Sequence, residues 1–260
     1  MPVVDTNLLV GSCPFRKIPA EPGDLERLRR SASLTRGVAT GFRSLLYYDP
    51  LAALVEDLTA YEAQADWLHF YAVINPAFPG LERQVTQAGA HRQVAGVRLF
   101  PTLHHYDLDA ERTYRALELA AARQLPVNLT ARIFDGRVAP RYVRQAEVDT
   151  ASLRRFLEQA AGTGGPVILS MFFFSELRAL EVDWEQLPNV YLDLGCSKPN
   201  VASLDELPSW FPTERVVFGS GAPFYYWQGS RLGLESSRLA TRQQQAILGA
   251  NAMKVFGWTW

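Results

Sequence analysis

Short apolar runs separated by longer amphipathic segments form the dominant pattern along this chain. The runs are apolar at nearly every position and rich in β-branched and aromatic residues, which is typical of strands buried on both faces of a parallel sheet. We therefore expect eight strands, at residues 2–7, 37–42, 69–75, 95–100, 126–130, 166–170, 189–194 and 215–220.

The segments between these runs carry helical patterns. In residues 49–64 the side chains of Leu51, Leu54, Leu58 and Tyr61 recur at steps of three and four residues, the spacing of one helix face. The same reasoning predicts further helices at 109–123, 152–161 and 241–256.

Alternation of strand and helix over 260 residues predicts an α/β fold with a parallel sheet, and eight units fit one (β/α)8 barrel domain covering residues 1–260. The site of such a barrel lies at the carboxyl ends of its strands. Residues 11–33 contain Pro, Gly and Arg and follow the first strand. We expect them to form a mobile loop that covers this site.

Charge and composition exclude several classes of partner. The chain has 26 basic and 27 acidic side chains and a net charge of −1, so no long-range field favours nucleic acid or an anionic membrane surface. No apolar run reaches the ~20 residues of a membrane span, and no basic segment followed by an apolar core precedes the first strand. A cytoplasmic protein is expected. The two cysteines, Cys13 and Cys196, are predicted to be buried thiols, with a nucleophilic role as the alternative.

Six segments in chain order resemble one known family, the amidohydrolase-related branch of the amidohydrolase superfamily. They are residues 3–7, 71–76, 96–101, 124–129, 216–223 and 247–252. The resemblance implies a distorted (β/α)8 barrel of the metallo-dependent hydrolase type. It also implies hydrolase or nonoxidative decarboxylase chemistry, with a divalent metal, often zinc, at the carboxyl-terminal mouth.

The residue types at the metal-binding positions of that family differ in this chain. The family's Asp-x-His-x-His pattern falls on residues 5–9, and its Gly-Ser-Asp-x-Pro pattern falls on residues 219–223. The positions of the family's ligands are held by Asn7, Leu9, Thr130, Ser170 and Gly221. Neutral hydroxyls and amides are poor zinc ligands, and aliphatic residues cannot bind a cation. We therefore expect no metal and no other cofactor.

Alternation along the strands indicates which polar side chains face the barrel interior. The candidate substrate-binding residues are Asn7, Arg98, Asn128, Thr130, Arg132 and Ser170, with Tyr225 added from the aromatic loop 222–229. Arg98 and Arg132 could bind a carboxylate in bidentate geometry. The alternative is a satisfied polar network in which Arg98 pairs with Asp5 or Asp193.

The candidate catalytic residues are His104, His105 and Asp193, assigned to proton transfer. The two histidines follow the fourth strand at the site end of the barrel. The alternative is that they are solvent-exposed loop residues. His69 and His91 lie at the opposite end and are interpreted as surface or packing residues. The aromatic loop could instead serve packing or an oligomer contact.

Two functions of different class follow from these observations. The first is a hydrolase or lyase that acts on a small carboxylate or lactone without a metal. The second is a catalytically inactive barrel, a pseudoenzyme, that binds a ligand or another protein. A small-molecule partner is expected in the first case, while assembly into a homo-oligomer stays open.

Overall fold

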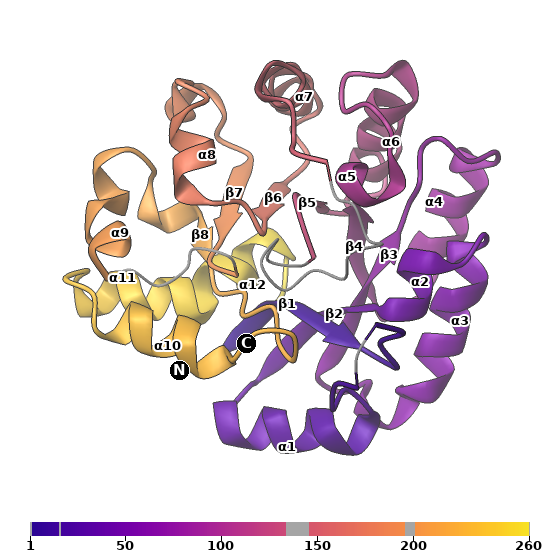
Figure 1. The fold of residues 1–260 in the computed structure, drawn as a ribbon, viewed down its shortest axis with the longest axis horizontal. Helices are drawn as coiled ribbons and strands as arrows, with labels where there is room; N and C mark the ends of the chain where they lie inside the picture. Colours follow the sequence, from indigo (N-terminus) through magenta and orange to yellow (C-terminus); the bar gives the residue numbers. More distant parts are fainter. Residues whose placement is uncertain (1, 16, 134–145, 196–200, 260) are drawn as a thin grey trace.

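The computed structural model describes residues 2–15, 17–133, 146–195 and 201–259, except for the side chains of 201–203. Eight parallel strands pair in chain order from β1 to β8, and helices surround them (Figure 1). The predicted (β/α)8 barrel is confirmed. The strands are β1 (Val4–Val10), β2 (Arg36–Gly41), β3 (Leu68–Val73), β4 (Val94–Leu99), β5 (Val127–Thr130), β6 (Val167–Ser170), β7 (Val190–Asp193) and β8 (Val216–Val217).

Backbone hydrogen bonds between β1 and the segment that continues β8 bring the two ends of the sheet together. Thr6 N donates to Phe218 O at 2.9 Å, Gly221 N donates to Asn7 O at 2.9 Å, and Leu9 N donates to Ala222 O at 2.8 Å. Because these bonds satisfy backbone groups that an open edge would leave unpaired, the sheet is held as a nearly closed barrel.

The helices occupy most of the predicted segments. The predicted helix 49–64 is α3 followed by η1, and the predicted helix 241–256 is the continuous run of α11, the π-helical η5 and α12. The helices are α1 (Pro22–Ala32), α2 (Phe42–Leu46), α3 (Pro50–Ala60), η1 (Glu62–Gln64), α4 (Leu81–Gly89), α5 (Pro101–His104), α6 (Glu111–Ala121), α7 (Thr150–Thr163), α8 (Phe174–Arg178), η2 (Trp184–Gln186), α9 (Val201–Glu206), η3 (Leu207–Ser209), η4 (Thr213–Arg215), α10 (Trp227–Glu235), α11 (Thr241–Gln245), η5 (Ala246–Ala250) and α12 (Asn251–Val255). Among the described residues no helix is both long and apolar enough to cross a lipid bilayer.

The prediction of a continuous loop over residues 11–33 is wrong for its second half, which forms α1. Pro22 stands in the first turn of this helix, where its fixed φ favours the helical backbone. The carboxylate of Asp24 accepts a hydrogen bond from Glu21 N at 3.2 Å, and Leu25 and Ala32 are buried. The covering segment is therefore short: Gly11 N donates to Ala20 O at 3.1 Å, which closes the loop at its base.

The carboxyl-terminal segment packs against the barrel at the amino-terminal ends of its strands. Phe256 and Trp258 are stacked with ring centroids 4.6 Å apart, and both contact a buried cluster that includes Val4 and Val217. Trp258 also contacts His69, with ring centroids 4.7 Å apart.

Replacing Asn251 by alanine is expected to lower the free energy of unfolding by about 1–3 kcal/mol. The side-chain amide of Asn251 donates to Thr213 O at 3.0 Å and to Val216 O at 2.7 Å, and truncation removes both of these buried hydrogen bonds. Urea denaturation measures the change, with the exposed Gln245→Ala as the control. Equal losses in the two variants would contradict this role for Asn251.

Candidate functional site

Arg98 on β4 lies inside the barrel, with only 1% of its surface exposed. Its Nε donates to Thr130 Oγ1 at 2.7 Å, and its two terminal nitrogens donate to Thr40 Oγ1 at 3.1 Å and to Asn7 Oδ1 at 2.8 Å. The three acceptors come from β5, β2 and β1. One guanidinium group therefore links four strands near their carboxyl ends.

A chain of hydrogen bonds continues from this guanidinium across β5, β6 and β7. Thr130 Oγ1 donates to Asn128 Oδ1 at 2.8 Å, and Asn128 Nδ2 donates to Ser170 Oγ at 2.7 Å. Ser170 Oγ in turn donates to Asp193 Oδ2. The side chains of Arg98 and Asp193 are thus connected through three neutral groups. We call Asn7, Thr40, Arg98, Asn128, Thr130, Ser170 and Asp193 the central network.

Asp5 on β1 is a second buried carboxyl group beside this network, with 1% of its surface exposed. Its Oδ1 accepts hydrogen bonds from Asn7 N and Ser220 N, both at 3.0 Å. Ser220 Oγ accepts a hydrogen bond from Ala222 N at 3.0 Å. Asp5 therefore ties β1 to the segment that follows β8.

Burial shifts the proton affinities of all three ionisable groups. It lowers the pKa of Arg98 to about 10, which still leaves the guanidinium charged at neutral pH. Burial raises the pKa of Asp5 to about 7, against hydrogen bonds from Ser220 and Asn7 that lower it. The pKa of Asp193 is also raised by burial, and hydrogen bonds from Ser170 and Gly195 and the charge of Arg98 oppose the rise. The site thus combines one fixed cation with two carboxyl groups of raised pKa.

Two glycines leave the space that Asn7 and Asp193 occupy. A Cβ atom on Gly195 would lie 2.7 Å from Asn7 Nδ2 and 2.8 Å from Asp193 Oδ1, and one on Gly219 would lie 2.8 Å from Asp193 Cγ. Any larger residue at these positions would push the two side chains apart. Because the backbone passes so close to the network at these two positions, only glycine fits there.

An apolar cluster lies closer to the barrel mouth than the central network does. Its buried members stand at or just beyond the carboxyl ends of β1 to β5, and Cys13 from the loop 11–20 joins them. The Phe100 ring centroid is 5.0 Å from the Arg98 guanidinium. The buried members are Leu9, Cys13, Phe42, Leu45, Val73, Phe100 and Ile133, with Phe15, Ile18, Leu103 and Phe224 packed against them. We call this set the apolar cover, because it shields the network from solvent.

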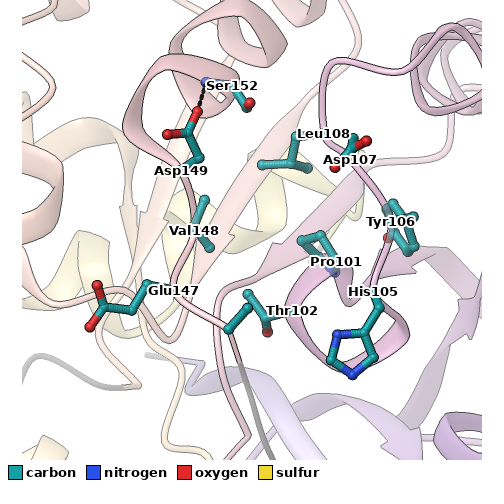
Figure 2. A pocket seen from close by; sticks show the side chains of 11 residues that line it. Pro101, Thr102, His105, Tyr106, Asp107, Leu108, Glu147, Val148, Asp149 and Ser152 are labelled. Atoms are coloured by element: carbon teal, nitrogen blue, oxygen red, sulfur yellow. Dashed lines mark hydrogen bonds between the residues drawn. The ribbon is translucent and has the colours of Figure 1, made fainter.

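The structure places the two predicted catalytic histidines outside the central network. The His104 ring is in hydrogen-bond contact with Leu45 O, 3.0 Å from Nε2, and burial lowers its pKa. His105 is exposed and lines a cavity of about 290 Å³ between α5 and the start of α7 (Figure 2). Asp149, which also lines this cavity, accepts a hydrogen bond from Ser152 N at 2.7 Å.

Arg132 and Tyr225 are placed apart from the network as well. Arg132 forms an ion pair with Glu176, with one N–O distance of 2.8 Å, and its guanidinium lies 4.1 Å from the Phe173 ring centroid. Tyr225 follows β8 and packs against Gly221. The predicted set therefore divides: Asn7, Arg98, Asn128, Thr130, Ser170 and Asp193 lie together, whereas His104, His105, Arg132 and Tyr225 lie elsewhere.

Sequence reasoning did not include Thr40 and Tyr71, which both contact Arg98, among the site residues. Thr40 accepts one of its hydrogen bonds, and two-residue alternation from Val38 along β2 could have identified it. Tyr71 is fully buried, with its ring centroid 5.7 Å from the guanidinium. The glycine opposite it, Gly96, makes room for this ring, because a Cβ there would approach the Tyr71 ring to 3.1 Å.

The donor atoms of this site do not fit a divalent metal. Asn7 and Thr130 already accept hydrogen bonds from Arg98, whose positive charge would repel a second cation. In the part of the chain that the structure describes, no three His, Cys, Asp or Glu side chains converge as metal ligands would. Of the two thiols, Cys13 is free and buried, and Cys196 lies outside the described residues.

No family model and no curated protein sequence matches this chain. Solved structures match over almost its whole length. A probable 2-pyrone-4,6-dicarboxylic acid hydrolase from Acinetobacter baumannii, with citric acid bound, is 15% identical over 99% of this chain and 100% of its own, with a TM-score of 0.69. A second structure, 5-carboxyvanillate decarboxylase from Sphingomonas paucimobilis, is 11% identical over 99% of both chains, with a TM-score of 0.72.

A third similar structure, an uncharacterised TIM-barrel protein from Bordetella bronchiseptica, is 16% identical over 99% of both chains, with a TM-score of 0.71. At these identities the likeness concerns the fold. It confirms the (β/α)8 barrel that the sequence pattern predicts.

Proposed function

We propose that this chain, with its amidohydrolase-type barrel, is a hydrolase or lyase of small carboxylates or lactones that works without a metal ion. One observation carries the proposal: the Arg98 guanidinium donates hydrogen bonds to the side chains of Asn7 and Thr130. In the family that the sequence resembles, these two positions hold metal-binding histidines. A guanidinium supplies a positive charge at the place where that family uses a metal.

The chemistry of Arg98 suits a carboxylate ligand. A guanidinium has five N–H donors in a rigid fork, and three hydrogen bonds of Arg98 go to the network. Two N–H groups are thus left for an oxyanion. Two proteins of similar structure, the dicarboxylic acid hydrolase and the carboxyvanillate decarboxylase, are named for carboxylate compounds.

Asp193 is the group that we assign to proton transfer. A carboxyl group with a raised pKa can hold a proton closer to neutral pH and return it, as a general acid and base must. Asp193 has this property and is joined to Arg98 through Ser170, Asn128 and Thr130. Asp5, with a pKa of about 7, is a second proton carrier near the same centre.

Substrate entry requires that the apolar cover open. Part of the apolar cover comes from loops: Cys13, Phe15 and Ile18 lie between β1 and α1, and Phe224 follows β8. Loops at these places commonly move over barrel sites. Once closed, the cover excludes water, which strengthens every electrostatic interaction inside.

A non-catalytic barrel is the second candidate, and the enclosure of the network favours it. Every member of the central network is buried, and its hydrogen bonds form a continuous set between β1 and β7. Such a network can hold strand register without performing a reaction.

Product formation distinguishes the two candidates. We expect the purified protein to bind no stoichiometric metal, as measured by elemental analysis, and to convert a member of a panel of small carboxylates and lactones, as measured by NMR. Asp193→Asn should lower turnover by about 10²-fold or more while ligand-induced thermal stabilisation is kept. The exposed Glu158→Gln on α7 is the control.

Two other outcomes would decide against the proposal. A ligand that stabilises the protein but is recovered unchanged supports the non-catalytic barrel. One equivalent of tightly bound metal would contradict the assignment of Arg98 as the cation of the site.

A further inference from the structure

A second cavity, of about 760 Å³, lies at the opposite end of the barrel from the mouth. The amino-terminal ends of β2, β3 and β4 meet there, so residues distant in sequence become neighbours. Its walls include Arg36, His69, His91, Arg92, Gln93 and Trp258. None of these residues contributes to the central network or the apolar cover.

The cavity has a positively charged side formed by two guanidinium groups. The pKa of His69 is lowered to about 4 by burial and by the charges of Arg36 and Arg92, so this imidazole is neutral at pH 7. Glu62 and Asp66 also line the cavity, and Asp66 lies 3.7 Å from a third guanidinium group, that of Arg29. The guanidinium groups of Arg36 and Arg92 are therefore the cationic groups that the cavity offers to an anion.

Gln93 adds an uncharged donor to the same walls. Its side-chain nitrogen is shielded from solvent and has no hydrogen-bond partner among the residues that the structure describes. A buried amide without a partner costs free energy, on the order of 1–3 kcal/mol, and such groups usually face a ligand or water. The backbone carbonyl of Gln93 is engaged, since it accepts a hydrogen bond from Phe70 N at 2.8 Å, which keeps the residue in place.

Trp258, the indole side chain that lines the cavity, is not free to stack on an aromatic ligand. The Trp258 ring is already packed by Phe256 at 4.6 Å, by His69 at 4.7 Å and by the Arg36 guanidinium at 4.9 Å between centres. Its faces are occupied, so it supports Arg36 instead of stacking on a ligand. The remaining recognition chemistry is that of N–H donors and positive charge, which suits an oxyanion.

We infer that this cavity binds a small oxyanion, a carboxylate or phosphate group held by Arg36, Arg92 and Gln93. The site lies on the face of the barrel that is distant from catalysis in this fold, so it is separate from the site of the proposed function. Binding there would connect β2, β4 and the carboxyl-terminal segment, and would therefore stabilise the native state.

Calorimetric titration with inorganic phosphate and, separately, with the tricarboxylate tricarballylate tests the inference. We expect one site per chain for at least one of these anions, and a rise in melting temperature of about 3–5 °C at ten times its dissociation constant. Binding of phosphate alone would identify a phosphate site, and binding of tricarballylate alone would identify a carboxylate site. Either result supports the inference.

Variants locate the bound anion. Arg92→Gln, at an exposed position, and Gln93→Leu should each weaken binding about tenfold, whereas Arg242→Gln, an equal charge change on α11, should leave it unchanged. Because Arg92 and Gln93 line this cavity and do not belong to the central network, weaker binding in these two variants separates the site from that network. Absence of saturable binding for both anions, or equal weakening by Arg92→Gln and Arg242→Gln, would overturn the inference.

Discussion

Replacement of Arg98 by methionine is expected to lower the free energy of unfolding by about 3–5 kcal/mol. Methionine fills much of the same volume but removes the hydrogen bonds to Asn7, Thr40 and Thr130. It also removes the positive charge that opposes the rise in the pKa of Asp193. Urea denaturation at pH 7 measures the loss, and Arg242→Met on the surface of α11 is the control.

The decrease in unfolding free energy caused by Arg98→Met should depend on pH. Without Arg98 the pKa of Asp193 rises further, so the carboxyl group takes up a proton as the pH falls and its uncompensated charge disappears. The difference in unfolding free energy between the Arg98→Met protein and the wild type should therefore become smaller as the pH is lowered. A loss below about 0.5 kcal/mol, as for an ordinary surface position, would show that the network does not depend on the guanidinium.

Replacement of Asp5 by asparagine is expected to flatten the pH dependence of stability. The folded-state pKa of Asp5 is about 7, above the ordinary value of 3.8 for an aspartate, so the native state holds a proton that the unfolded state releases. The contribution of Asp5 to the free energy of unfolding is therefore largest below about pH 4, and it is lost as the pH rises to 7. The wild type should lose on the order of 4 kcal/mol across this window through Asp5.

Asparagine imitates the protonated acid at this position. Its Oδ1 can keep the hydrogen bonds from Asn7 N and Ser220 N, and its amide can donate to Ser220 Oγ. The Asp5→Asn protein should therefore match the wild type near pH 4 and exceed its stability at pH 8. Unfolding in urea at four pH values between 4 and 8 tests this, with the exposed Asp107→Asn as the control. An unchanged slope would contradict a raised pKa for Asp5.

Much of the barrel could be predicted from local pattern, because its strands are buried on both faces and its helices on one. The expected strand at 126–130 agrees within one residue with β5, since the segment that follows Pro126 is short, contains β-branched Val127 and Thr130 and has no helical spacing. The helix α1 was missed because its short apolar face lies among charged side chains. Its first-turn proline and acidic residue were the signal that could have identified it.

Part of the candidate site could also be predicted, for the same reason of periodicity. Alternation along β4 and β5 placed Arg98, Asn128 and Thr130 on the inner face, and they lie together in the structure. It could not place His104 or Arg132, because a residue beyond a strand end follows the path of its loop. His104 contacts Leu45 from α2, and Arg132 pairs with Glu176 from α8.

The sequence by itself determined the order of strands and helices and the polar side chains that point into the barrel. It also determined the absence of histidines at the positions where the resembled family binds metal, because these properties depend on residue identity and spacing alone. Only the tertiary structure decided that Arg98 stands among those positions and that Asp5 has a pKa near 7. Both depend on partners that are remote in the chain, such as Asn7 for Arg98 and Ser220 for Asp5, and on the exclusion of water, which no local pattern records.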